Sequence, residues 1–366
     1  MGAVQDIFTQ YGNAYLERFG DAVPAPHRAV IRAVQNCRTP ALGVLLYTCS
    51  GCGEPHPVPC GCGNRHCPNC QQARAGKGLE KRLAEQLPGP HFLLTVTVPE
   101  PLRAFMRANQ ADTYAALFDV STSAIRDLAA EPKYVGGDLP GFFGVLHTWG
   151  RTLDYHPHIH YVVPGGALDR GSGLWKASRA DFFVPVHALS QIIRARFRDR
   201  MRDLGVLDGI DPEVWRQDWN VNSQAVGSNT GGVLRYLAAY VFRVAISDSR
   251  IVDVCDGRVT FTYRRVGSNR PQRMTLDALE FIRRFLQHVL PDGFRKIRYY
   301  GFMAPGCRVP HEQIETMVRL AYAFELPDIQ DSAPAAPPPP CCRHCGAPLR
   351  FSRRLGPDHL CLVGTA

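Results

Sequence analysis

The chain has 366 residues, of which 45% are hydrophobic and 20% are charged, so it is long enough for one large domain or two ordinary ones with a full apolar core. Its 42 Lys and Arg residues outnumber 33 Asp and Glu residues, and the net charge of +9 favours a polyanionic partner, with nucleic acid as the first candidate. The sequence contains no run of 18 apolar residues and begins without a signal-peptide pattern. We therefore expect a soluble, intracellular protein with no membrane partner.

Cysteines dominate the next part of the chain. Thirteen are present, and seven of them lie between Cys37 and Cys70, which in an intracellular protein indicates metal binding before disulfides. Cys49 and Cys52 form one Cys-x-x-Cys knuckle, and Cys67 and Cys70 form another. Each such knuckle turns tightly enough to bring two thiolates to one tetrahedral ion. These four cysteines are predicted to bind one structural Zn²⁺, the alternative being reduced bystander thiols.

Further metal-binding side chains and several basic residues surround these knuckles. Cys62 and His66 could replace a ligand, and together with Cys60 and His56 they could also support a second ion or have no role. The basic side chains that flank the site are Arg65, Arg74, Lys77, Lys81 and Arg82. The predicted zinc ion would therefore rigidify a small module that binds DNA.

Strand and helix patterns alternate after this module. Residues 91–99 read as a buried strand and residues 102–129 have helical periodicity. Residues 141–150 and 156–163 are expected to pair as an antiparallel hairpin, because only a short polar connection separates them. Further expected elements are a strand over 182–186, a helix over 187–204, a strand over 218–226 and a helix over 233–243. The first of these helices has arginines at two-residue spacing, which fits a solvated face and a DNA track equally well.

Three histidines, His156, His158 and His160, occupy every second position of the second hairpin strand. Since side chains alternate along a strand, all three would project from one face. Neutral imidazoles at that separation commonly share a divalent metal, although a histidine by itself is more often a surface or hydrogen-bonded residue. If the hairpin turn is centred near residues 152 and 153, His147 lies opposite His158; a slip of one residue would send it to the other face.

Two tyrosines, Tyr236 and Tyr240, lie four residues apart in the helix expected over 233–243, and therefore on one helical face. Arg235 and Arg243 lie next to that face. The alternative is an aromatic stripe packed into a core, but Leu and Val residues of the same helix already provide an apolar stripe. A phenol is a poor nucleophile at neutral pH unless a metal or nearby cations favour the phenoxide, and a histidine-held ion would meet that need.

Four of these stretches together carry a family resemblance: "CGNRHCPNCQ", "HPHIH", "VLRYLAAYVFRVAIS" and "FIRRFLQHVLPDGFRKIRYYGF". From about Cys37 to about Phe302 the chain resembles the rolling-circle transposases of bacterial insertion sequences, in the two-tyrosine branch of the HUH endonucleases related to Helitrons. The resemblance implies an α+β fold, with a palm-like or RRM-like antiparallel sheet flanked by helices and preceded by a small zinc-binding module. It also implies a protein of the bacterial cytoplasm that associates with the nucleoid.

The resemblance further implies a mechanism. His158 and His160, with one further polar residue, would hold Mg²⁺ or Mn²⁺ on the scissile phosphate of single-stranded DNA. Tyr236 or Tyr240 would attack to form a 5′-phosphotyrosine link and release a 3′-OH, and the second tyrosine could cut another strand. The third metal ligand depends on strand register and is either His147 or Gln224. His156 would support a ligand or contact DNA.

The last third of the chain fits a DNA-handling enzyme without adding chemistry. Residues 250–265 are predicted to form a hairpin that turns at Asp256 and Gly257, followed by an amphipathic helix over 275–290. Residues 294–302 interleave cations with aromatic side chains, which suits phosphate contact and base stacking but also an ordinary basic strand. The predicted DNA contacts are Arg65, Arg74, Lys77, Arg235, Arg243, Arg295, Lys296 and Arg298. After a proline-rich linker, the last residues are expected to be a disordered basic tail or a small zinc knuckle made by Cys342, Cys345, His359 and Cys361.

These patterns divide the chain into five contiguous stretches. They are an N-terminal helical segment (1–36), a zinc-binding module (37–88), a nuclease domain (89–330), a linker (331–340) and a Cys/His tail (341–366). The expected partner is single-stranded DNA at transposon ends and at the target. A replication initiator or relaxase with the same chemistry is one alternative, and a phosphodiesterase that uses water is another. A non-catalytic zinc-ribbon DNA-binding protein is a third, but it would leave the histidines and the tyrosine pair without a role.

Overall fold

The computed structural model describes residues 2–71, 87–226, 245–265, 267–268, 270–322 and 340–357. The protein is α+β with antiparallel sheets, as expected, and it divides into two compact units. The first, which we call the cysteine unit, comprises residues 1–80, 242–289 and 332–366; the second, the histidine unit, comprises residues 81–241 and 290–331. Whereas the expected domains were contiguous stretches, each of these compact units is assembled from separate parts of the chain.

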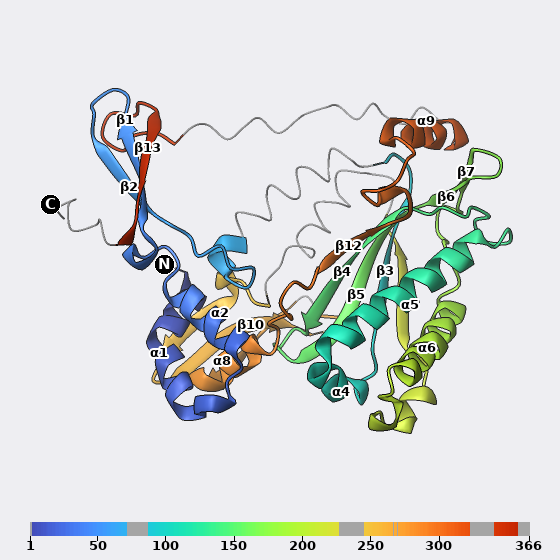
Figure 1. The fold of residues 1–366 in the computed structure, drawn as a ribbon, viewed down its shortest axis with the longest axis horizontal. Helices are drawn as coiled ribbons and strands as arrows, with labels where there is room; N and C mark the ends of the chain where they lie inside the picture. The colour runs from blue at the N-terminus through green and yellow to red at the C-terminus, as the bar shows by residue number, and fades with distance from the viewer. Residues whose placement is uncertain are drawn as a thin grey trace. The chain divides into compact units, whose positions relative to one another are not determined.

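A five-stranded antiparallel sheet forms the centre of the histidine unit (Figure 1). In spatial order its strands are β12 (Ile297–Tyr300), β4 (Phe142–Trp149), β5 (Tyr155–Pro164), β3 (His91–Thr97) and β8 (Asn220–Ala225). The predicted hairpin is therefore confirmed as β4–β5, and the strands predicted over residues 91–99 and 218–226 are β3 and β8. Alternation along each strand gives this sheet two chemically different faces.

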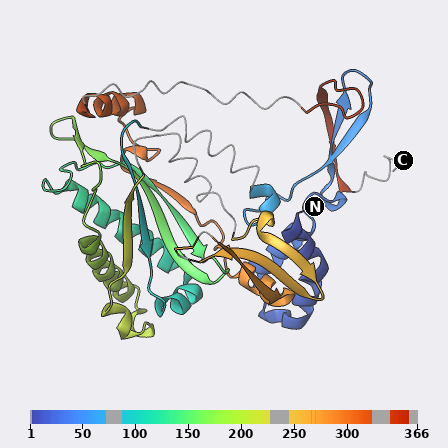
Figure 2. The same cartoon turned by 180° about the vertical axis from the view of Figure 1, so that it is seen from behind.

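Helices cover one face of this sheet. They are α4 (Leu102–Ala108), α5 (Gln110–Ala130) and α6 (Val186–Asp203), and both views show α5 and α6 along the same side (Figures 1 and 2). The buried core on this side combines Leu146 and Ile159 of the sheet with apolar residues of α5 and α6. The single helix predicted over 102–129 is broken at Asn109, whose backbone (φ −124°, ψ 47°) leaves the helical region.

The prediction of a strand over residues 182–186 was wrong. Phe183 and Val184 are buried, but no strand forms there, and Pro185 is the residue that precedes α6. A short apolar run is compatible with a buried strand and with a buried connection, and Pro185 has no N–H to give to a sheet. Burial alone therefore accounts for the apolar pattern.

A smaller apolar cluster completes the histidine unit. The hairpin of β6 (Gly166–Asp169) and β7 (Leu174–Ala177) contacts α9 (His311–Tyr322), and Trp175 packs edge-on against Phe302 at 5.7 Å between ring centroids. Within the described parts of the chain, no helix has the length and apolar character needed to cross a membrane.

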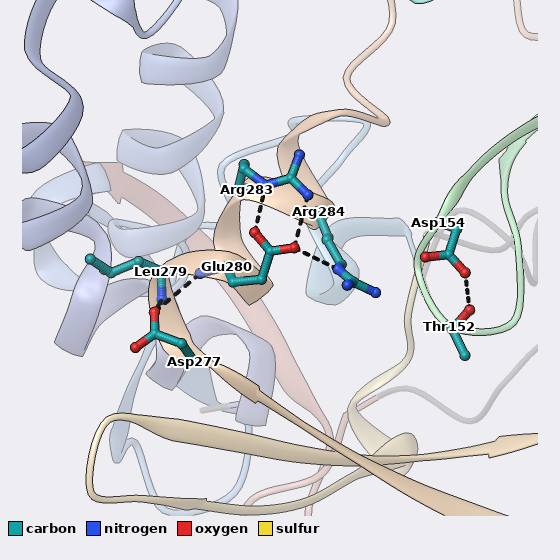
Figure 3. Close-up of polar contacts among 7 residues, drawn as sticks. All are labelled: Thr152, Asp154, Asp277, Leu279, Glu280, Arg283 and Arg284. Carbon is teal, nitrogen blue, oxygen red and sulfur yellow. Dashed lines mark hydrogen bonds and ion pairs between the residues drawn. The ribbon is translucent and has the colours of Figure 1, made fainter. Parts of the chain in front are cut away.

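The helical part of the cysteine unit packs α1 (Ala3–Phe19) against α2 (Ala25–Gln35) and α8 (Ala278–Leu286). The aromatic rings of Phe8 and Phe285 meet at 5.1 Å. Asp277 caps α8 by accepting hydrogen bonds from the N–H groups of Leu279 (2.9 Å) and Glu280 (3.3 Å), as Figure 3 shows.

The sheet that accompanies these helices is formed by β9 (Ile251–Cys255), β10 (Arg258–Arg264) and β11 (Pro271–Asp277). Its first turn is the predicted one, because Asp256 and Gly257 both have positive φ values, 50° and 71°. The helix predicted from residue 275 begins three positions later, since residues 275–277 pair with β10 instead.

A second three-stranded sheet joins distant parts of the chain within the cysteine unit. The strands β1 (Val44–Cys49) and β2 (Pro55–Pro59) form a hairpin, and β13 (Leu349–Leu355) pairs antiparallel with the other edge of β1. The strand β13 lies in the segment expected to be a disordered basic tail or a small zinc knuckle, and residues 349–355 form a paired strand there. Its extended backbone obtains its hydrogen-bond partners from β1.

Candidate metal centre and cysteine sites

The histidine row of β5 lies on the sheet face opposite the helices. Leu146 and Ile159 are paired across the β4–β5 ladder and face the helical layer, so the neighbouring pair, His147 and His158, faces the other way. This register is the one predicted from a turn near residues 152 and 153. Figure 3 shows that turn, in which the hydroxyl of Thr152 donates a hydrogen bond to Asp154.

His147, His158 and His160 form a compact cluster. One ring nitrogen from each lies within 4.8 Å of the others, and the ring centroids of His158 and His160 are 4.7 Å apart. Burial lowers the pKa of His160 to about 4, and burial together with neighbouring His160 holds the pKa of His158 well below its ordinary value. These two imidazoles are therefore neutral at neutral pH, which is the form that binds a metal ion.

Hydrogen bonds orient the two histidines of β5. Nδ1 of His158 lies 2.7 Å from the carbonyl oxygen of His156, and because a carbonyl only accepts, Nδ1 is the donor and Nε2 keeps its lone pair. Nδ1 of His160 is 3.0 Å from the hydroxyl of Thr95, which follows from the pairing of these two residues between β3 and β5. Hydrogen bonds of this kind fix ring orientation in metal sites. Three imidazoles fit a divalent ion that keeps further positions for water or substrate oxygens.

The two candidates for the third ligand differ in position. His147 is buried on the strand next to β5, directly opposite His158. Gln224 is exposed on β8, where it pairs with Leu93, so β3 separates it from the histidine row. The structure therefore brings His147 into the cluster and leaves Gln224 two strands away.

Five further residues surround the histidines, and three of them were not singled out from the sequence. Trp149 stacks on His147 at 4.7 Å, and the ammonium group of Lys296 lies 4.7 Å from the Trp149 ring centroid. Arg103 of α4 lowers the pKa of His156, after the larger effect of burial. His156 lies outside the three-ligand cluster but its carbonyl orients His158. Thr95, Trp149 and Arg103 come from separate elements, so no spacing in the sequence connects them.

Among the residues that the structure describes, the cysteines gather into two clusters instead of one. Their members are Cys37, Cys62, Cys67 and Cys70 in one, which we call the first cluster, and Cys49, Cys52, Cys342 and Cys345 in the other, the second cluster. In each, the four sulfur atoms lie within 4.8 Å of one another. The two knuckles expected to share one ion are thus separated. The hairpin β1–β2 is the reason, because it places Cys49 and the residues after Pro59 at opposite ends of a strand that spans about 17 Å at about 3.4 Å per residue.

Distances in the first cluster fit a tetrahedral zinc site. The Sγ atom of Cys70 lies 3.6 Å from that of Cys37 and 3.7 Å from that of Cys62, and it accepts a hydrogen bond from the N–H of Gly63 at 3.3 Å. Sulfurs about 2.3 Å from a tetrahedral ion are about 3.8 Å from each other. Burial raises the pKa of the Cys37 thiol to about 11, so a cation is needed before all four ionise together.

Comparisons with known proteins cover the regions that hold the histidine cluster and the first cysteine cluster. A family model described as "Putative transposase" matches residues 141–312, which include the histidine cluster, and one described as "Transposase zinc-binding domain" matches residues 7–98. "Putative transposase y4qJ" of Sinorhizobium fredii is 38% identical over 320 residues, covering 82% of this chain and 80% of that protein. "Transposase for insertion sequence element IS801" of Pseudomonas savastanoi pv. phaseolicola is 30% identical over 294 residues, covering 73% and 68%.

The chain belongs to the insertion-sequence transposases of the IS91 and IS801 type. This is the rolling-circle HUH family that the sequence resembles. The predicted catalytic residues of this transposase, Tyr236 and Tyr240, lie outside the described residues but inside the transposase match.

The predicted DNA contacts of this transposase have different surroundings. Arg295 is exposed, whereas Arg298 packs over the ring of Phe118 at 4.5 Å and forms an ion pair with Asp119 at 3.8 Å on the helix-covered face. Arg65 lies in a turn before Cys67. Arg74, Lys77, Arg235 and Arg243 lie outside the described residues, as do His359 and Cys361.

The arginines of α6 can be described in more detail. Arg194 pairs with Asp218 at 3.2 Å, and Arg196 pairs with Asp127 at 2.6 Å. Arg202 pairs with Asp199 at 2.7 Å. Protein carboxylates already contact these guanidinium groups. The arginines of α6 therefore fit a solvated helix face better than a track for DNA.

Proposed function

We propose that this transposase nicks and rejoins single-stranded DNA at the ends of its element, in transposition of the rolling-circle type. The reaction passes through a 5′-phosphotyrosine intermediate, and the histidine unit is an HUH endonuclease-type domain. The observation that carries the proposal is the convergence of His147, His158 and His160 on one sheet face in a chain of the transposase family. The partners are single-stranded DNA at the element ends and at the target.

The three imidazoles are the ligands that would hold a divalent ion. When bound there, Mg²⁺ or Mn²⁺ supplies Lewis-acid stabilisation of the charge that develops on the scissile phosphate. The carbonyl of His156 and the hydroxyl of Thr95 fix the rings of His158 and His160 before substrate arrives. Since Mg²⁺ prefers oxygen ligands and imidazole is a softer donor, this set favours Mn²⁺ of the two.

The tyrosines of the sequence provide the nucleophile. The phenolic oxygen of Tyr236 or Tyr240 attacks the phosphorus, its proton leaves, and the P–O bond to the 3′-oxygen breaks, so that this oxygen takes up a proton as a free 3′-OH. The 5′-phosphate remains linked to the tyrosine. One phosphodiester has been exchanged for another, and rejoining therefore needs no ATP. A second tyrosine one helical turn away allows a second strand to be cut while the first end is held.

Positive charge near the histidines supports an anionic substrate. Lys296 lies over Trp149, which itself stacks on His147, and the charge of Arg103 acts on His156 and His158. Cations near a metal centre attract a phosphate backbone and stabilise the charge that develops during its cleavage.

A covalent-adduct assay tests the proposal. Labelled single-stranded oligonucleotides from the flanks of the gene are incubated with the protein and Mn²⁺, stopped with EDTA and separated on a denaturing gel. We expect a slowed, protease-sensitive DNA band that the double variant Tyr236→Phe/Tyr240→Phe and the variant His160→Ala do not form. The matched control Tyr263→Phe, which removes a hydroxyl bonded to Gln272 at 3.0 Å, retains the band.

Other outcomes would contradict the proposal. Cleaved DNA without an adduct indicates a phosphodiesterase that uses water, and binding without cleavage indicates a zinc-ribbon binding protein. A replication initiator or relaxase with the same chemistry would form the adduct but would not join the two element ends to each other, so sequencing of the joined products separates it from a transposase.

A further inference from the structure

The second cysteine cluster joins two ends of the sequence. Cys49 is the last residue of β1 and Cys52 follows it, whereas Cys342 and Cys345 precede β13. The family model for the zinc-binding domain covers residues 7–98 and the transposase model covers residues 141–312, so Cys342 and Cys345 lie outside both. Neither match assigns a role to this half of the cluster.

The sulfur positions of this cluster fit a tetrahedral ion. The Sγ atoms of Cys49 and Cys345 are 3.3 Å apart, and those of Cys52 and Cys342 are 3.7 Å apart. All four sulfurs lie within 4.8 Å of one another. Sulfurs bound to one zinc ion at about 2.3 Å are about 3.8 Å apart, so an ion fits with shifts of a few tenths of an ångström.

Both halves of the cluster are built alike. The sequences "CSGCG" (49–53) and "CRHCG" (342–346) share the pattern Cys-x-x-Cys-Gly. In each, the glycine has a left-handed backbone, with φ of 75° at Gly53 and 76° at Gly346. Each glycine N–H also bonds to the carbonyl of the first cysteine, at 3.1 Å and 2.9 Å. Two stretches that lie far apart in the sequence therefore adopt the same knuckle turn.

Donors surround the sulfurs and stabilise negative charge on them. The N–H groups of Gly51 and Cys52 donate to Sγ of Cys49 at 3.3 Å and 3.4 Å. The N–H of His344 donates to Sγ of Cys342 at 3.4 Å, and Nε2 of His56 lies 3.2 Å from the same sulfur. Hydrogen bonds to a charged acceptor are stronger than those to a neutral one, and such contacts are the kind that accompany metal-bound thiolates.

The sheet next to the cluster holds the two knuckles in register. Cys49 pairs with Leu349 between β1 and β13, and the backbone N–H of Ser50 donates to the carbonyl of Pro348 at 3.1 Å. The hydroxyls of Thr48 and Ser352 meet at 2.6 Å. The ligands are thus positioned by a ladder that begins directly beside them.

We propose that Cys49, Cys52, Cys342 and Cys345 bind a second structural Zn²⁺, distinct from the one expected at the first cluster, and that this ion fastens β13 to the zinc-binding region. Each chain then carries two zinc ions. Four thiolates select zinc among the structural metals, and a closed four-cysteine site has no open position for catalysis. The C-terminal stretch is consequently a part of the zinc-binding region.

Metal content tests this proposal on the full-length protein. We expect two zinc ions per chain by elemental mass spectrometry, falling to one in the double variant Cys342→Ser/Cys345→Ser. The matched controls are Cys341→Ser, an exposed cysteine next to the cluster, and Cys255→Ser, an exposed cysteine of β9; both retain two. One zinc ion in the wild type, two in the double variant, or iron in place of zinc would overturn the proposal.

A second measurement remains decisive if the double variant does not fold. The wild-type protein is treated with a thiol-alkylating reagent while a chelator slowly removes zinc, and labelled peptides are identified by mass spectrometry. Peptides containing Cys49 and Cys52 should become labelled at the same chelator concentration as the peptide containing Cys342 and Cys345. Labelling of the C-terminal pair before any zinc is released would show that these cysteines hold no ion.

Discussion

The histidine cluster and the cysteine clusters both gather metal-binding side chains, but they are built in opposite ways. His147, His158 and His160 come from a single hairpin, and hydrogen bonds with a backbone carbonyl and a hydroxyl group orient two of them. The cysteine clusters draw ligands from stretches as far apart as Cys49 and Cys345. The histidine site is therefore local in sequence, whereas the cysteine sites are formed by the tertiary structure.

The chemistry of the ligands sharpens this contrast. Burial keeps the imidazoles of His158 and His160 neutral, so the cluster is compatible with a folded sheet whether or not an ion is present. Four cysteines that must all be thiolates repel one another unless a cation is bound between them. We therefore expect metal removal to abolish activity at the histidine cluster but to unfold the region around each cysteine cluster.

The largest effect is expected at the first cysteine cluster. Substituting Cys67→Ser should release one zinc ion and destabilise the cysteine unit by at least about 4 kcal/mol, since structural zinc binding contributes directly to folding. Zinc content and thermal unfolding followed by circular dichroism measure this. The matched variant Cys60→Ser, at a cysteine outside both clusters, should retain the ion and the wild-type Tm. If the two variants have the same zinc content and the same Tm, the first cluster is not a zinc site.

The next effect separates the two candidates for the third ligand. His147→Gln should lower Mn²⁺-dependent nicking about 100-fold, equivalent to about 2.7 kcal/mol, with little change in Tm. Gln224→Ala, on the exposed strand β8, should stay within about threefold of wild type. Single-turnover nicking at several Mn²⁺ concentrations provides the comparison, and a larger loss in the Gln224 variant would reverse the assignment.

A smaller effect tests how His160 is oriented. Thr95→Val removes the hydroxyl beside Nδ1 and should weaken Mn²⁺ binding about tenfold, which corresponds to about 1.4 kcal/mol. Thr97→Val on the same strand is the matched control. Thr97 pairs with His158, but a backbone carbonyl, not a threonine hydroxyl, orients the His158 ring. Electron paramagnetic resonance of bound Mn²⁺ measures affinity without requiring activity. If both variants bind equally, the Thr95 hydroxyl does not position the ligand.

The smallest effect concerns stability that needs no metal. Arg283, and then Arg284, hold the pKa of Glu280 at about 2 by the hydrogen bonds that Figure 3 shows. A carboxyl whose pKa is lowered by folding stabilises the protein above its ordinary pKa of 4.5 and loses this contribution as the pH falls towards about 2.

Because Glu280 is partly exposed, its stabilisation is at most about 1 kcal/mol. Glu280→Gln should therefore have a lower Tm than wild type at pH 6, and the difference should shrink by pH 3. Glu17→Gln, at an exposed residue of α1, is the matched control and should have the wild-type Tm at pH 6. A Tm difference for Glu280→Gln that persists unchanged at low pH would contradict an ionic origin.

Local patterns predicted the secondary structure well where a turn or an alternation is strong. The hairpin β4–β5 follows from two apolar runs and a short connection, and β9–β10 follows from Asp256 and Gly257. The strand predicted over the run containing Phe183 and Val184 does not form, because these residues are apolar to suit a buried connection and not a strand. The strand β13 has little apolar pattern, and its pairing with β1 is decided by distant residues.

The sequence by itself determined that His158 and His160 share a face, because alternation along a strand needs no information beyond the strand. It also determined that each Cys-x-x-Cys pair turns as a knuckle, since the glycine or neighbouring turn residues act within a few positions. Only the tertiary structure decided which cysteines meet in one cluster, because a pair of thiolates can complete a tetrahedral site with any other pair. The hairpin β1–β2 and its pairing with β13 bring Cys49 and Cys52 to Cys342 and Cys345.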